Sequence, residues 1–138
     1  MNISVETILL YTIGAGFLSI VYGYFTGKNI LNSSAGNIKM REIASAIQIG
    51  AKAYLARQYK TISIVGIVVL VIVSIAFSPL VGLGYLIGAT LSGIAGYVGM
   101  LVSVQANVRT AEASRKGLAS GLSVAFKSGA VTGMLVAG

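Results

Sequence analysis

The longest uncharged stretch of the chain runs from Thr61 to Val108 and contains no Lys, Arg, Asp, Glu or His. It is more than twice as long as the ~20 apolar residues that one helix needs to cross a bilayer. Pro79 interrupts it, and proline cannot continue a helix and disfavours helical backbone in the residue before it. We therefore expect two membrane-spanning helices, residues 61–78 and 81–108, joined by a turn around Pro79.

The rest of the chain also has the composition of a membrane protein. Hydrophobic residues make up 56% of it and charged residues 9%, against about 25% charged in soluble domains. Residues 5–25 and 118–138 form two further apolar segments, and the second is expected to be truncated because little sequence follows Lys127. Glu6 and the length of the first run argue against a cleaved signal peptide. We predict an all-α, polytopic membrane domain of about four spans over residues 1–138.

The segment 26–60, between the first and second spans, is polar and basic. Gly, Asn and Ser are frequent up to Asn37, which indicates a loop. From residue 39 to residue 60, apolar side chains recur at helical spacing, which predicts an amphipathic helix. Such a helix either runs on into the second span or lies on the membrane surface. After the third span, Gly117 is expected to break or loosen the helix.

All ten Lys and Arg residues lie within segments 26–60 and 109–127. In a four-span topology both segments are on one side, which the positive-inside rule makes cytoplasmic, so the N-terminus and the Pro79 turn are expected outside. Their position between apolar segments favours lipid head groups over nucleic acid as partners. We expect a cytoplasmic basic face formed by Arg57, Lys60, Arg109, Arg115 and Lys116.

A stripe of small residues follows one face of the third span. Its members are four residues apart, which is close to one helical turn. In lipid, helices associate through such residues because the backbones can approach closely. We expect a helix–helix contact at Gly84, Gly88, Ser92 and Gly96.

The acidic residues are too few and too dispersed for catalysis. They are Glu6, Glu42 and Glu112, each near the edge of an apolar segment. A proton or cation relay needs ionisable groups within the membrane, and magnesium sites usually use carboxylates. The absence of Cys and His removes the other common metal ligands. We therefore predict no catalytic, metal-binding or substrate-binding residue in this chain.

Three segments resemble the N-terminal part of the membrane-bound, ion-translocating inorganic pyrophosphatases. They are GAKAYLARQYKTI at 50–62, GATLSGIAGYVGMLVSVQANVRTAEASRKGL at 88–118 and AFKSGAVTGM at 125–134. The resemblance implies the early, outer-ring helices of a homodimeric many-helix pump, which hydrolyses pyrophosphate with magnesium and transports protons or sodium. The family's catalytic residues lie in Asp-rich motifs on later helices that do not occur here, so none is transferred to this sequence. The expected role is that of a scaffold, inactive alone, which contacts lipid and the remaining helices of the pump.

The residues alone leave one alternative open, a free-standing small membrane subunit or adaptor without enzymatic activity. That alternative requires the fourth span to be complete, whereas the resemblance makes this chain the front part of a longer pump.

Overall fold

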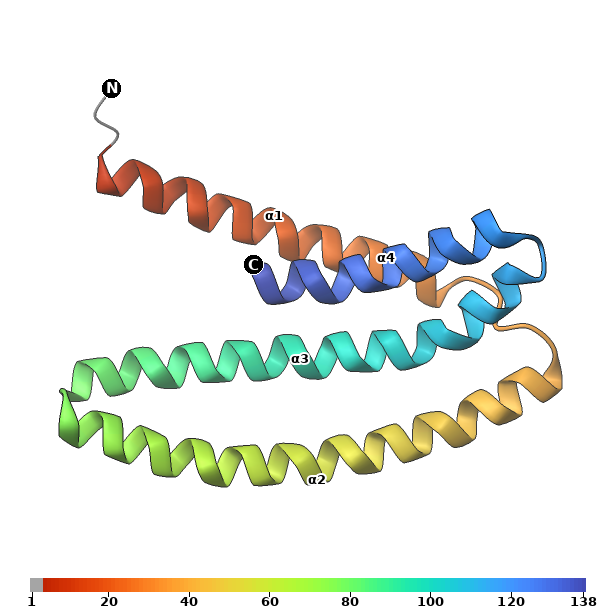
Figure 1. Cartoon of the computed structure of the whole chain (residues 1–138). Helices are drawn as coiled ribbons and strands as arrows, with labels where there is room; N and C mark the ends of the chain where they lie inside the picture. The colour runs from red at the N-terminus through yellow and green to blue at the C-terminus, as the bar shows by residue number, and fades with distance from the viewer. Residues whose placement is uncertain (1–3) are drawn as a thin grey trace.

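The computed structural model of the protein describes residues 4–138, which form four α-helices (Figure 1). Each helix is long and apolar enough to cross a membrane. The prediction of an all-α protein with four spanning helices is confirmed. The helices are α1 (Val5–Leu31), α2 (Ile38–Ala76), α3 (Pro79–Ser114) and α4 (Leu118–Ala137).

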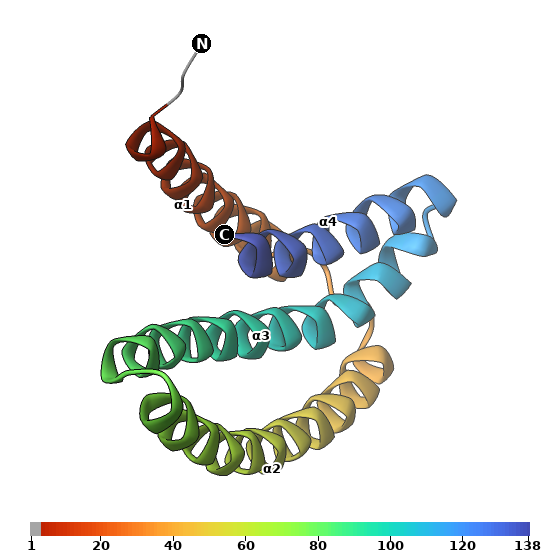
Figure 2. The same cartoon turned by 60° about the vertical axis from the view of Figure 1, so that its left-hand side comes forward.

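α3 is the central helix of the structure. It packs against α2 on one side and against α4 on the other, and α4 packs in turn against α1. α1 also contacts α3, whereas within residues 4–138 α1 and α2 have no packing contact. α1, α3 and α4 therefore form one group, and α2 joins it through α3 (Figures 1 and 2). The polar connections 32–37 and 115–117 lie at one end, and the start of α1 and the α2–α3 turn lie at the other.

α2 joins the predicted amphipathic segment and the second span into one helix of 39 residues. Asn37 caps its start, and the Asn37 side chain accepts a hydrogen bond from the Met40 N–H at 2.9 Å. Met40 and Ile43 line a shallow groove with Val104 and Val108 of α3. The apolar side of the segment therefore faces α3, and the segment runs on into the second span. At ~1.5 Å per residue α2 is about 58 Å long, which exceeds a ~30 Å hydrocarbon layer.

α1 extends farther than predicted, because the polar residues at its end had indicated a loop. The sequence predicted a loop from residue 26, but the helix continues to Leu31 and the connection is limited to residues 32–37. Gly27 is buried against α4, where an added Cβ would lie 3.7 Å from Val131 Cγ1. This close packing outweighs the weak helix propensity of glycine, which is a local preference of about 1 kcal/mol.

The turn between α2 and α3 consists of Phe77 and Ser78 alone. The Ser78 side chain caps α3 by accepting a hydrogen bond from the Val81 N–H at 3.4 Å. Pro79 is the first residue of α3 and not part of the turn, because proline at this position loses no helical hydrogen bond.

α3 and α4 are separated at Gly117, as that glycine indicated. Its φ of 132° and ψ of 160° lie in a region that is open essentially to glycine alone. Gly121, one turn into α4, packs so closely on α3 that an added Cβ would overlap the Ser114 hydroxyl. The short connection therefore depends on two glycines, one for backbone conformation and one for close approach.

Candidate functional site

Arg109, near the end of α3, makes hydrogen bonds to two backbone carbonyls. Its Nε and Nη2 donate to the Leu31 carbonyl at 3.2 and 2.6 Å, and its Nη1 donates to the Gln105 carbonyl at 2.7 Å. Leu31 is the last residue of α1, so its carbonyl lacks a partner within the helix. The cation also compensates the negative end of the helix dipole. Arg109 therefore caps α1 from a different helix.

A small apolar core lies beside this cap and joins three helices. It consists of Ile30 from α1, Val102 and Ala106 from α3, and Val131 from α4. All four side chains are buried. The core and the Arg109 cap lie at the same level along the helices, and together they join α1, α3 and α4 there.

Three cations lie at this same height. Gly27 faces Val131, and α1 and α4 run antiparallel. Leu31 follows Gly27 by one turn and Lys127 precedes Val131 by one turn, so Leu31 and Lys127 are level with each other. Arg109 binds Leu31 and Lys28 adjoins Gly27 along α1. We call Lys28, Arg109 and Lys127 the cationic belt. Of these three residues, the sequence analysis assigned only Arg109 to the cytoplasmic basic face. The height of Lys127 could not be predicted, because it depends on where α4 begins relative to the end of α1.

Two of the other predicted basic residues lie just beyond the cationic belt. Arg115, at the end of α3, pairs with Glu112 through Nη1 and Oε2 at 3.2 Å. Its side chain is 62% exposed. Lys116 follows in the connection to α4 and is also exposed. Both residues are at the same end of the molecule as Arg109.

Arg57 and Lys60 lie far from that group. Tyr59, between them, donates a hydrogen bond to the Gly93 carbonyl at 2.8 Å. Gly93 precedes Arg109 by about 24 Å along α3, at ~1.5 Å per residue. The structure therefore separates the five predicted basic residues into two groups. Arg57 and Lys60 are exposed on α2, and long basic side chains can extend along a helix toward the head groups.

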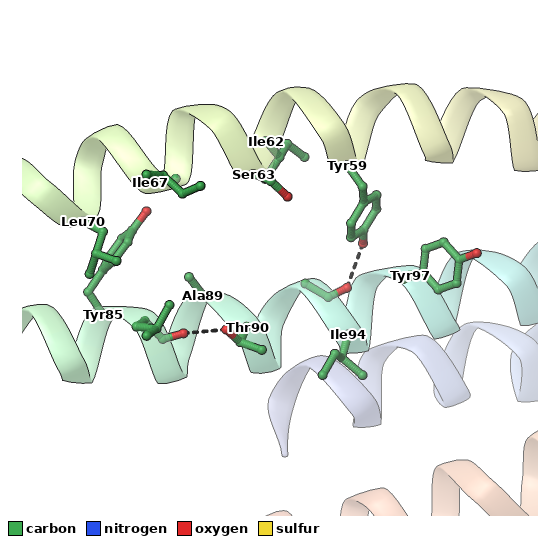
Figure 3. Close-up of a pocket in the computed structure, with 13 residues that line it drawn as sticks. Tyr59, Ile62, Ser63, Ile67, Leu70, Tyr85, Ala89, Thr90, Ile94 and Tyr97 are labelled. Carbon is green, nitrogen blue, oxygen red and sulfur yellow. Dashed lines mark hydrogen bonds between the residues drawn. The ribbon is translucent and has the colours of Figure 1, made fainter.

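A cavity of about 550 Å³ lies between α2 and α3 (Figure 3). The Tyr59 hydrogen bond closes one end, where the Tyr59 and Tyr97 rings meet edge to face at 5.3 Å. Tyr85 of α3 points across the cavity toward α2. No charged residue lines it: the lining residues are Tyr59, Ile62, Ser63, Gly66, Ile67, Leu70, Tyr85, Leu86, Ala89, Thr90, Gly93, Ile94 and Tyr97. Such a surface suits apolar chains rather than catalysis.

The small-residue stripe of α3 is mostly uncovered within residues 4–138. At Gly84 and Gly88 an added Cβ would meet no atom within 4 Å, and Ser92 is exposed. Gly96 differs, since a Cβ there would lie 3.1 Å from the Tyr59 hydroxyl. The structure thus brings one member of the stripe to a helix contact and leaves the other three open.

The acidic side chains offer no metal site. Among the described residues there is no group of three or more His, Cys, Asp and Glu that could hold a metal ion. Glu6 lies in the first turn of α1, at the far end from Glu42 and Glu112. Glu112 is already paired with Arg115. These residues do not fit the magnesium that the family resemblance implies.

Comparison with known proteins finds one family. The family model described as inorganic H+ pyrophosphatase matches residues 17–138. A K(+)-insensitive pyrophosphate-energized proton pump of Methanosarcina mazei is 44% identical over 126 residues, which cover 90% of this chain and 19% of that pump. A putative K(+)-stimulated pyrophosphate-energized sodium pump of Clostridium tetani is 39% identical over 129 residues, covering 94% and 19%. The chain therefore spans about a fifth of the length of these curated relatives.

Proposed function

Because the chain belongs to the inorganic H+ pyrophosphatase family, we propose that it is the N-terminal part of a pump coupling pyrophosphate hydrolysis to proton or sodium transport. The family match over residues 17–138 carries this proposal. Membership also confirms the family that the sequence motifs predicted. Both a proton pump and a sodium pump are among the relatives, so the proposal keeps both ions.

Within such a pump these four helices serve as a scaffold. The cap between Arg109 and Leu31, the shared apolar core and the tight α2–α3 turn are all contacts that hold helices together. The described residues provide no acidic cluster for magnesium. Pyrophosphate and magnesium would therefore bind to parts of the pump, expected to be a homodimer, that lie outside these helices.

The scaffold role predicts different outcomes for the isolated chain and for a chimeric pump. The purified 138-residue chain in lipid nanodiscs should release no phosphate from magnesium pyrophosphate above the empty-nanodisc level. A chimera that carries residues 17–138 in the matching region of the Methanosarcina mazei pump should hydrolyse pyrophosphate and transport protons. Hydrolysis by the isolated chain would exclude a pure scaffold, and a folded but inactive chimera would argue against the pump.

The topology follows from the two polar connections, which carry or adjoin most of the basic side chains. We propose that residues 32–37 and 115–117 are cytoplasmic and that the turn at Phe77 is outside. The chain has no Cys, so single cysteines can report on each side. Ser34→Cys should react with an impermeant maleimide only from the cytoplasmic side, and Phe77→Cys only from outside. The opposite pattern would reverse the orientation.

The small-residue stripe is proposed to pack against a helix of the pump beyond these residues. Gly84 and Gly88 precede Val102 and Ala106 by about five turns, and they therefore lie on the side of α3 that packs on α4. Gly88→Leu should leave the isolated chain as stable as before, because no atom lies within 4 Å of the added Cβ. In the chimera the same substitution should lower stability. Equal stability in both contexts would exclude this contact.

A further inference from the structure

A second groove, of about 460 Å³, opens between α1 and α3. α4 lies behind it and contributes Val131 and Leu135, while α3 contributes Val98 and Val102. On α1 the groove is lined by Gly23 and Gly27, which have no side chain, and by the side chains of Ile20, Tyr24 and Leu31. Its walls are apolar for most of their length.

One end of this groove is polar and positively charged. Lys28 and Asn32 line it at the end of α1. Lys28 is exposed and has no ion-pair partner among residues 4–138. The other members of the cationic belt, Arg109 and Lys127, lie at the same height. The nearest acidic side chain of α3 described here, Glu112, pairs with Arg115.

We propose that this groove binds one anionic phospholipid, with its phosphate at Lys28 and Asn32 and an acyl chain along the apolar walls. An apolar surface that ends in a cation matches the two parts of such a lipid. Basic pockets between spanning helices on the cytoplasmic side are known to bind anionic head groups. The α2–α3 cavity is similar in its apolar lining, but no charged residue is among the residues that line it. It should therefore accept acyl chains without selecting a head group, which makes it an internal control.

Tryptophan fluorescence can measure the two sites separately, since the chain contains no Trp. Val98→Trp introduces a single fluorophore into the proposed lipid groove, and Ile67→Trp introduces one into the α2–α3 cavity. Each variant is reconstituted in phosphatidylcholine vesicles with increasing fractions of dibrominated phosphatidylglycerol or dibrominated phosphatidylcholine, whose bromines quench tryptophan on contact. One lysine near the surface should favour phosphatidylglycerol about fivefold at Val98→Trp. At Ile67→Trp the two lipids should quench equally.

Charge variants then test whether Lys28 recognises the phosphate. In the Val98→Trp background, Lys28→Gln should abolish the preference for phosphatidylglycerol and Lys28→Arg should retain it. Lys39→Gln removes an exposed lysine that does not line the groove and should change nothing. Asn32→Ala is a second test, which leaves the charge unchanged and should weaken the preference for phosphatidylglycerol. It replaces Lys28→Gln if that variant fails to fold.

Three results would overturn the proposal. The first is equal quenching by both lipids at Val98→Trp, and the second is a preference that survives Lys28→Gln. The third is the absence of quenching by either lipid, which would mean that protein, such as a second copy of the chain, covers the groove. None of these measurements requires pyrophosphatase activity, so the lipid site and the proposed pump function can fail independently.

Discussion

Loss of the Arg109 guanidinium should loosen the junction between α1 and α3. Arg109→Met keeps an unbranched apolar stem and removes both hydrogen bonds to the Leu31 carbonyl. Hydrogen bonds to a charged group contribute about 1.5–3 kcal/mol, and a cation at a helix C-terminus contributes about 0.3–1 kcal/mol. Arg109 is only half-buried, so the lower end of each range applies. We expect the free energy of unfolding to fall by about 2 kcal/mol.

This loss can be measured by titrating the chain from a mild detergent into sodium dodecyl sulfate and following helical circular dichroism. Amide hydrogen exchange should in addition show faster exchange in the last turn of α1. Arg115→Met is the matched control. Its side chain is 62% exposed and pairs only with Glu112 three residues away, so its removal should cost less than about 0.5 kcal/mol. Equal losses in the two variants, or a stable last turn in Arg109→Met, would refute the capping role.

Four further substitutions can be followed by the same titration. Gly23→Leu should lower the free energy of unfolding by about 1–3 kcal/mol, because its Cβ would already lie 3.2 Å from Leu135 Cγ. Gly14→Leu has no atom within 4 Å of its Cβ and should be neutral or stabilising, so equal effects of the two would contradict the packing of α1 on α4. Tyr59→Phe removes the hydrogen bond to the α3 backbone and should cost about 0.5–1 kcal/mol; an unchanged midpoint would show that this bond contributes nothing. Gly117→Ala should cost about 1–3 kcal/mol because of its positive φ, and an unaltered transition would argue against that backbone conformation.

The prediction of helices was accurate where the signal was continuous and less accurate at helix ends. Long apolar runs identified the four spans. Pro79 was assigned to a turn, whereas it begins α3, because the same residue type that ends one helix is well suited to start the next. Residues 26–31 were assigned to a loop and are helical, because the packing of Gly27 against Val131 cannot be read from the neighbouring sequence.

The functional features were predictable to different extents. The family could be recognised from motifs, since these are contiguous in the chain. Arg109 was identified by its charge, but its role as the cap of α1 depends on Leu31, 78 residues away in the sequence. Lys28 was counted among the basic residues that set the orientation and Asn32 gave a loop signal, but the groove that they share with α3 and α4 was not predicted.

The sequence by itself determined that this chain enters the membrane, how many times it crosses, and which connections share a side. Those properties depend on each segment's own transfer into lipid and on the position of its charges, so they can be evaluated segment by segment. Only the tertiary structure decided which helices touch and where grooves remain between them. In lipid, helix contacts depend on close packing and on specific hydrogen bonds rather than on general hydrophobicity. Those contacts join residues distant in the chain, such as Gly27 with Val131 and Arg109 with Leu31.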